Sequence, residues 1–225
     1  MENEKNESSA DLLEIPLFPL NLVLYPGMVL PLHIFEERYR SMIGACIETK
    51  QPFGVVLIKE GSEVGPAATP ERIGTTTRIL ESQMLPEGRM NILTRGDQRF
   101  EVVEVVQKTP HLVGRVRMLE EADGGASSEQ IDEVQGEFEI YLRDMGRLAG
   151  DAANDILPTE KPNELSYSIA AKLSSSIKLP SEMRQHWLEL DSAKPRLDSI
   201  ITVLRGLNKA LAQELERRAS DVGLN

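Results

Sequence analysis

The sequence predicts an α+β fold, in which a strand-rich first part is followed by an all-helical second part. Up to about residue 120, apolar and β-branched runs of strand length alternate with turns that contain Gly and Pro, and one segment alone has helical spacing. Beyond the small, polar segment 123–128, apolar residues recur at helical spacing instead. About six strands with a single long helix form the pattern of a small closed or half-closed β-barrel.

The length and these changes of pattern predict the domain organisation. A chain of 225 residues has room for one large or two modest domains. The first residues are polar and charged and have little to bury, so they are expected to form a flexible tail. The expected parts are a tail at 1–11, a barrel at 12–122, a linker at 123–128 and a helical bundle subdomain at 129–225.

The first elements follow from prolines placed among aliphatic residues. Pro16 and Pro19 lack an amide hydrogen, which confines their strand to an edge or to an irregular path. Pro26 and Gly27 form a turn, and the amphipathic segment that begins at Glu36 has helical spacing. The expected order is a strand at 12–20, a turn at 25–27, an extended run at 28–34 and a helix at 36–50.

The remaining strands are separated by Gly- and Pro-containing turns. The β-branched run Phe53–Lys59 has the length of a buried strand, and a Gly-, Pro- and Ala-rich loop at 61–70 follows it. Residues 86–89, Pro-Glu-Gly-Arg, form a hairpin turn after a partly polar strand. The later strands are expected at 73–85, 90–96, 100–107 and 111–120.

The second part contains four helical patterns. Asn163 is well placed to cap one of these helices, and the last helix, after Pro195, carries a leucine-rich stripe typical of packing against other helices. The expected helices lie at 129–148, 163–174, 181–190 and after 195.

Charge and cysteine content limit the possible partners and compartment. The net charge is −11, and residues 120–225 hold 12 Lys and Arg against 20 Asp and Glu, which disfavours nucleic acid as a partner. A single cysteine cannot form an internal disulfide, which fits a reducing, cytoplasmic compartment. No membrane association is expected, because prolines interrupt the most apolar segment. A local basic face remains an alternative, and its candidate members are Arg89, Arg95, Arg99, Arg115 and Arg117.

The motifs of common catalytic sites are missing. A phosphate-binding P-loop requires a Gly-Lys pair, and the sequence contains none. The GxSxG motif of serine hydrolases is also absent, and the three histidines lie far apart in the sequence. His33 and Glu36 are the one pair with metal-ligand spacing, but they span a strand-to-helix junction, and Cys46 lies on the apolar face of its helix. No catalytic residue, metal or cofactor is therefore predicted.

Several ordered motifs closely resemble the amino-terminal substrate-recognition domain of Lon proteases, a domain also found in free-standing proteins. The opening of that family has Pro-Leu-Phe-Pro, a Pro-Gly turn, Pro-Leu-x-Ile-Phe-Glu and Arg-Tyr, and later positions follow its Gly-Thr, Leu-Pro-x-Gly-Arg and Gly-x-x-Arg-Phe patterns. The helical half is similar more weakly, at Leu165–Ala170 and in the spaced leucines. The matching positions are 16–19, 26–27, 31–36, 38–39, 74–75, 85–89 and 96–100.

The resemblance implies a PUA-like β-barrel followed by a helical bundle, and a non-catalytic function. The ATPase and Ser-Lys peptidase domains of full-length Lon are missing from the sequence, so membership of peptidase family S16 would describe ancestry only. The chain is therefore expected to be a free-standing adaptor or regulator in protein quality control that binds unfolded or flexible polypeptide, and a protease or chaperone is a candidate partner. RNA binding by the barrel and a cryptic small-molecule enzyme stay open as alternatives.

The expected recognition surface lies between the barrel and the helices, near Leu22–Phe35. An apolar surface of more than about 300–600 Å² would suit unfolded polypeptide. Each candidate polar residue also has a purely structural interpretation: turn packing for the tyrosine, a hydrogen-bonded strand residue for the histidine, and helix-start ion pairs for the other two. The candidates are Tyr25, His33, Glu36 and Arg38.

Overall fold

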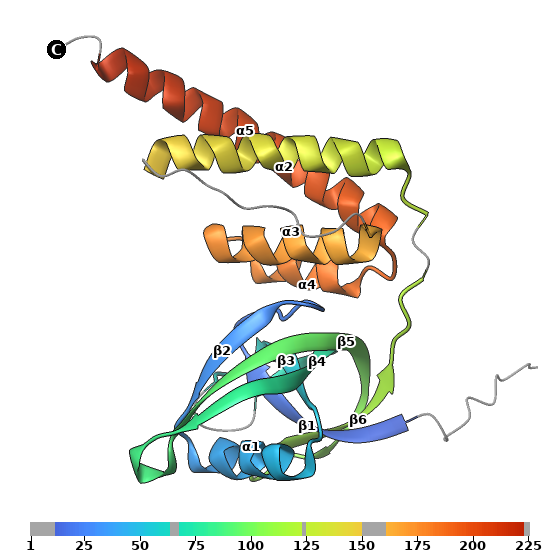
Figure 1. Cartoon of the computed structure of the whole chain (residues 1–225). Helices are drawn as coiled ribbons and strands as arrows, with labels where there is room; N and C mark the ends of the chain where they lie inside the picture. The colour runs from blue at the N-terminus through green and yellow to red at the C-terminus, as the bar shows by residue number, and fades with distance from the viewer. Residues whose placement is uncertain (1–11, 64–67, 123–124, 150–160, 223–225) are drawn as a thin grey trace, which may run out of the picture. The chain divides into compact units, whose positions relative to one another are not determined.

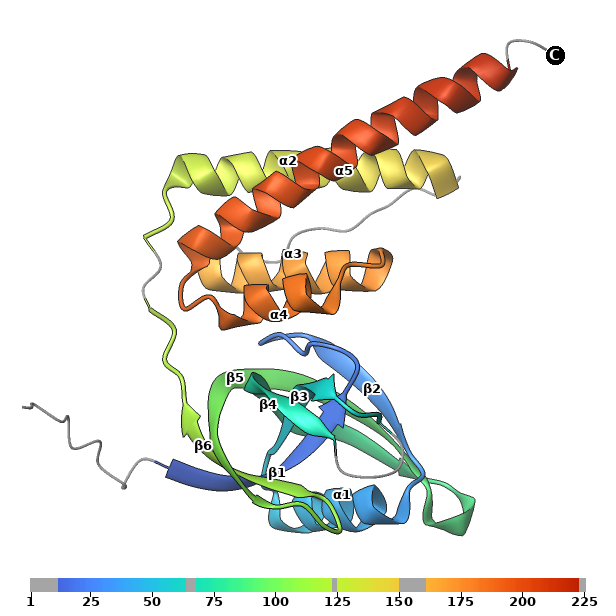
Figure 2. The ribbon, with the colours of Figure 1, turned by 180° about the vertical axis from the view of Figure 1, so that it is seen from behind.

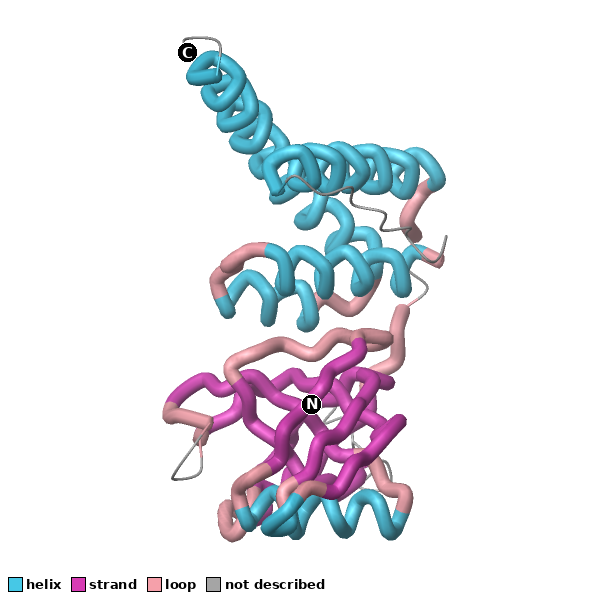
Figure 3. Tube along the Cα trace, turned by 60° about the vertical axis from the view of Figure 1, so that its left-hand side comes forward, coloured by secondary structure: helices cyan, strands magenta, loops and turns pink. Residues whose placement is uncertain are grey.

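A computed structural model of the chain describes residues 12–63, 68–122, 125–149 and 161–222. The expected tail at 1–11 and residues 123–124 of the expected linker lie outside these ranges. The chain forms two compact units, of which the first comprises Met1–Glu120 with Leu179–Glu189 and the second Glu121–Lys178 with Leu190–Asn225. All described strands belong to the first unit, and helices alone make up the second (Figure 3), so the α+β class is confirmed.

Six strands in the first unit form a mixed sheet in the order β2-β5-β4-β3-β1-β6. An additional pairing between β5 and β6 closes five of these strands into a ring, and β2 is added to β5 outside it (Figure 1). Among the described strands, β1 and β3 alone pair in parallel. The strands are β1 (Leu12–Leu20), β2 (Val29–Ile34), β3 (Phe53–Glu60), β4 (Thr69–Met84), β5 (Met90–Gln107) and β6 (Leu112–Met118).

Strand β5 is a single strand of 18 residues, whereas two separate strands, at 90–96 and 100–107, were expected. Its pairing with β4 and with β6 shifts register at several points, for example between Val102 and Glu104. Such bulges bend a strand and increase its twist. The bend lets β5 pair with β2 along its first part and with β6 along its second.

The two prolines of β1 lie where that strand has a neighbour on one side only. Pro16 lies within the pairing with β6, which covers Leu12 to Leu17. Pro19 lies within the pairing with β3, which begins at Leu17 and ends at Leu20. Because a proline cannot donate to a ladder, it is tolerated where one side of the strand is unpaired. An edge-like environment, expected from sequence, therefore exists at each proline although β1 lies inside the sheet.

Helix α1 (Glu37–Thr49) lies at one end of the strands (Figures 1 and 2). Its apolar face is buried against side chains of β1, β2, β3 and β5 in one core cluster. The helix ends at Lys50, which has left-handed backbone angles and donates its N–H to the Cys46 carbonyl. The buried residues of α1 are Tyr39, Met42, Ile43 and Cys46.

Helix α4 (Ser181–Glu189) belongs to the first unit although its sequence lies among the helices of the second. Two side chains from the rest of the first unit donate hydrogen bonds to α4, and one side chain of α4 donates a bond in return. The Tyr25 hydroxyl donates to the Arg184 carbonyl (3.0 Å), and the buried Arg99 donates to the Leu188 carbonyl (2.8 Å). Gln185 Nε2 donates back to the Ile73 carbonyl (3.0 Å). These bonds, with a fully buried Trp187, fix α4 on the strand region.

The second unit consists of α2 (Ser128–Ala149), α3 (Pro162–Ser176) and α5 (Ala193–Val222). Helix α5 packs against both α2 and α3. The buried Arg196 of α5 donates to the Ser166 hydroxyl (2.8 Å) and the Tyr167 hydroxyl (2.7 Å), and its guanidinium lies 3.7 Å from the centre of the Tyr167 ring. One buried cation thereby joins α3 to α5.

The expected capping role of Asn163 was wrong. Helix α3 begins at Pro162, after Lys161 as the N-cap, and no side chain caps it. Proline is favoured at the first helical position because its φ is already helical and its missing N–H would be unpaired there anyway. Asn163 Nδ2 donates instead to the Ala122 carbonyl at 3.3 Å.

Replacing Gly74 with alanine should destabilise the first unit. A Cβ at Gly74 would lie 2.6 Å from the Val55 carbonyl oxygen and 2.7 Å from the Phe100 ring. We expect Gly74→Ala to lower the free energy of unfolding by about 1–3 kcal/mol in urea denaturation. Gly44→Ala is the control, because a Cβ there meets nothing within 4 Å and should stabilise α1 by about 0.5–1 kcal/mol. Equal stability of the two variants would contradict this packing.

Replacing Arg99 with methionine should loosen α4. The change removes the donor to the Leu188 carbonyl, and an unpaired buried acceptor costs about 1–3 kcal/mol. The only tryptophan of the chain, Trp187, lies on α4, so its fluorescence should report the loosening during urea titration. The control is Arg72→Met. The Arg72 side chain is 73% exposed in its ion pair with Glu101, so its loss should change the free energy of unfolding by less than about 1 kcal/mol. An unchanged midpoint for Arg99→Met would refute the anchoring role.

Candidate functional site

The candidate site is built on three strands that extend beyond the ring. Strand β4 has 16 residues and β3 has 8, and their pairing ends where Phe53 faces Thr77. Beyond that point β4 pairs with β5 alone among the described strands, and β5 pairs with β2. We call this part, formed by β2, residues 90–95 of β5 and residues 78–84 of β4, the three-stranded extension.

The extension has one buried and one exposed face. Leu30, Ile34, Met90 and Ile92 are buried in the core cluster that includes α1. Residues between them point the other way, as alternation along strands requires, and these are largely exposed. The exposed face is thus presented on a rigid support.

Exposed apolar side chains concentrate on this extension. Among the described residues, five large hydrophobic side chains are at least half exposed, and four of them lie on β2, directly after it or near the end of β4. Surface apolar residues that are scattered singly need no explanation, whereas a concentration of them marks an interaction site. The four are Val29 (50%), Phe35 (52%), Leu80 (52%) and Met84 (65%).

His33 lies on the exposed face of the extension. Its Nδ1 is 2.7 Å from Oδ1 of Asn91, which is its cross-strand partner on β5. Its ring stacks on that of Phe35, with centroids 6.0 Å apart. This pair lies on the same side of the extension as Val29, whereas Met84, the cross-strand partner of the buried Met90, lies on the side of α1.

Glu36 and Arg38 form an ion pair at the start of α1. Arg38 Nε lies 3.0 Å from the Glu36 carboxylate, and its Nη2 donates to the Glu63 carbonyl at 3.1 Å. The guanidinium also lies 4.5 Å from the centre of the Tyr39 ring. The pair links the start of α1 to the segment after β3, so both side chains stabilise the local structure. Both are also partly exposed.

Tyr25 is separated from the other three predicted residues. Its side chain is fully buried, and it bonds to α4 at the opposite end of β2 from His33. Residues 26–32, which include the first part of β2, lie between them. His33, Glu36 and Arg38 therefore lie together around the end of β2 and the start of α1, and Tyr25 lies apart from them.

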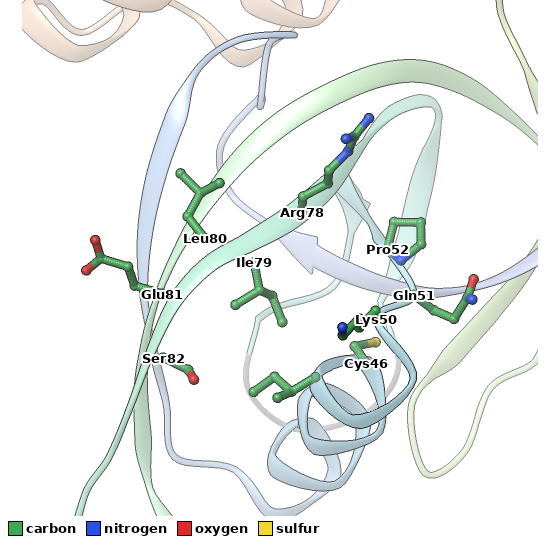
Figure 4. Close-up of a pocket in the computed structure, with 10 residues that line it drawn as sticks. Cys46, Lys50, Gln51, Pro52, Arg78, Ile79, Leu80, Glu81 and Ser82 are labelled. Carbon is green, nitrogen blue, oxygen red and sulfur yellow. The ribbon is translucent and has the colours of Figure 1, made fainter.

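A groove between α1 and the end of β4 was not expected from the sequence. One cavity of about 560 Å³ lies at the C-terminal end of α1 (Figure 4), and a second of about 500 Å³ lies along its N-terminal half. Ile47 lines both cavities. We call the two together the α1–β4 groove. The difference in length between β3 and β4 was the only sequence signal for it.

The groove has no catalytic constellation. Burial raises the pKa of the Cys46 thiol, so the reactive thiolate is disfavoured. Lys50, Arg78 and Glu81 line the same cavity. In the described ranges, no group of three or more His, Cys, Asp or Glu side chains is arranged to hold a metal ion.

The five arginines proposed for a basic face differ in their surroundings. Arg99 is buried. Arg115 pairs with Glu14 (2.9 Å) and Glu104 (2.8 Å), and Arg117 pairs with Glu101 (3.0 Å). Arg89 lies 3.7 Å from Glu87, and Arg95 is exposed on β5. The carboxylates beside three of the five arginines weaken the case for a basic face.

Comparison with known proteins assigns the family. The family described as the ATP-dependent protease La (LON) substrate-binding domain matches residues 14–206. The chain belongs to this family. The LON substrate-binding domain accounts for both units, because the match runs from β1 into α5. The expected resemblance is thereby confirmed.

Curated relatives are full Lon proteases. The chain is 26% identical over 197 residues to the Lon protease of Anaeromyxobacter dehalogenans and 29% identical over 197 residues to Lon protease 2 of Myxococcus xanthus. In each case the match covers 84% of this chain and 23% of the relative. The chain therefore spans about a quarter of the length of these relatives.

Solved structures agree with the assignment. A crystal structure of a Lon N-terminal domain protein from Xanthomonas campestris superposes with a TM-score of 0.62 at 26% identity, covering 84% of this chain and 98% of that one. The N-terminal domain of Mycobacterium avium complex Lon protease has a TM-score of 0.63 at 16% identity, covering 86% and 98%, and supports the fold alone. None of the described helices has the length and hydrophobicity of a membrane span.

The buried thiol gives a test of the groove's chemistry. Because burial raises the pKa of the Cys46 thiol and limits access to its sulfur, less of the reactive thiolate is present near pH 8. We expect its reaction with Ellman's reagent at pH 8 to be slower in native protein than in urea, and to accelerate as pH rises toward the raised pKa. The urea-unfolded protein is the reference. Equal rates in both states would contradict a buried, protonated thiol.

Proposed function

We propose that this LON substrate-binding domain recognises unfolded or flexible polypeptide without chemically changing it, and acts as an adaptor or regulator of protein degradation. The observation that carries the proposal is the concentration of exposed apolar side chains on the three-stranded extension. The family description, a substrate-binding domain of an ATP-dependent protease, supports the same direction. Apolar side chains on a rigid sheet suit unfolded chains, because such chains expose apolar groups that folded proteins bury.

The predicted polar residues take different parts in this proposal. His33 and its partner Asn91 lie beside Phe35, where they would form hydrogen bonds at the margin of the apolar patch. Glu36 and Arg38 would hold the start of α1 and the segment near Glu63 in position. Tyr25 is buried, so we assign it to positioning of α4.

Replacing the four exposed apolar residues of the extension with serine should weaken polypeptide binding. We expect Val29→Ser, Phe35→Ser, Leu80→Ser and Met84→Ser, combined in one variant, to lower affinity for a fluorescently labelled, reduced and alkylated unfolded protein by at least about tenfold. Removing apolar contact area costs about 25 cal/mol per Å², so four such side chains suffice for that loss. Fluorescence anisotropy measures the affinity.

The remaining exposed apolar residues provide a matched control. Leu13, Val103, Val106 and Ile140 lie outside the extension and are 37–52% exposed. Their combined replacement with serine should change the affinity by less than about twofold. Equal loss in both variants, or no binding of the unfolded probe by the unaltered protein, would overturn the proposal.

A further inference from the structure

We propose that the α1–β4 groove binds an extended polypeptide segment as an added strand on the free edge of β4. The inference rests on the proposed function, and it specifies the conformation, direction and charge pattern of the bound segment. Strand addition uses main-chain hydrogen bonds for affinity and alternate side chains for selectivity.

The first argument is the free backbone edge. Within the described residues, Arg78–Met84 pairs with β5 on one side and with no strand on the other. The Leu85 N–H donates to the Arg89 carbonyl at 2.8 Å, which makes these two residues a hydrogen-bonded pair. Bonded and non-bonded pairs alternate along an antiparallel ladder. The N–H and C=O groups of Met84 and Ser82 therefore point away from β5.

The free groups face the groove. Ser82 lines the cavity at the C-terminal end of α1, and Met84 lines the cavity along its N-terminal half. Helix α1 forms the opposite wall of both cavities, with Ile47 common to them. Each cavity lies within the range of about 300–1,000 Å³ that is usual for ligand sites. An edge strand facing a helix across such a space can accommodate a further strand.

The direction of the added strand follows from β3. That strand is antiparallel to β4, and its pairing begins where Phe53 faces Thr77. A bound segment antiparallel to β4 would occupy the place that β3 would fill if it began earlier. Its C-terminal end would then approach Pro52, beside Arg78, and its N-terminal end would lie beside Met84.

Charge at the two ends of the groove specifies the occupant. Lys50, Arg78 and Glu81 line the cavity near Pro52, where Arg78 also pairs with Asp97 at 2.6 Å, so cations are in excess there. Glu37, Glu48 and Arg40 line the cavity beside Met84, where Arg40 donates to the Glu87 carbonyl and carboxylates are in excess. The complementary occupant is a segment of another protein with basic side chains at its N-terminal end, apolar β-branched residues in the middle and acidic side chains at its C-terminal end.

The test uses a defined peptide and a backbone change at Ser82. The probe is a fluorescein-labelled, C-terminally amidated peptide with two lysines, then alternating valine and threonine, then two aspartates. Ser82→Pro removes one free-edge N–H without removing a bond to β5, and Ser82→Ala keeps that N–H. We expect Ser82→Pro to bind the peptide about tenfold more weakly than Ser82→Ala, the loss that one hydrogen bond accounts for.

Modified peptides make the test independent of protein folding. Two versions of the probe are N-methylated at alternate amides, one at odd and one at even positions, and are measured with unaltered protein. An added strand points only one of these sets at β4, so one version should lose at least about tenfold in affinity and the other should bind like the parent peptide. A version with the charged ends exchanged should also bind more weakly.

The outcomes separate this inference from the proposed function. Equal binding by both N-methylated peptides, equal binding by the two Ser82 variants, or no binding of the parent peptide overturns strand addition in the groove. Leu80 and Met84 line the groove, whereas Val29 and Phe35 do not. If the unfolded protein probe still binds and the paired change Val29→Ser with Phe35→Ser weakens its binding, the proposed function stands without the groove. If neither probe binds, both proposals fail.

Discussion

The pairing of one long strand with three others is the constraint on which the first unit depends. Strand β5 pairs with β2 and β4 along its first part, and with β6 along its second. A straight strand of 18 residues would be about 60 Å long and could not close a ring of this size. The register shifts bend it, so the same strand both closes the ring and supports the extension.

The groove is a consequence of this geometry. The ring requires β4 to pair with β3 only as far as Thr77, because the chain before β3 turns away at Pro52 into α1. The extension requires β4 to continue along β5 to the hairpin at 86–88. The edge that β3 leaves uncovered then faces the helix that precedes β3. Natural sheets usually protect such edges with charge or a bulge, and here Leu80 lies at a register shift while Arg78 and Glu81 flank it.

Local sequence patterns predicted the elements well where one physical rule dominated. Strand β1 and the turn at Pro26–Gly27 follow from apolar runs and backbone restriction, and α1 follows from its periodicity. The continuity of β5 could not be predicted, because Gly96 and the charged residues after it suggest a turn. A Cβ at Gly96 would lie 2.3 Å from the Tyr25 carbonyl oxygen, so this glycine permits the turn before β2 to approach β5 closely. The start of α3 was also missed, because Pro162 outweighs an asparagine as a helix initiator.

The candidate site was harder to predict than the fold, because it depends on distances between elements. His33, Glu36 and Arg38 could be found as polar residues among apolar ones, but burial of Tyr25 follows only from the docking of α4. The family assignment to a substrate-binding domain fits the free strand edge and the exposed apolar side chains of the extension. Main-chain hydrogen bonds along a strand edge can be made by almost any polypeptide and would supply affinity, whereas the charges that line the two cavities would set a preference for the direction of the bound segment.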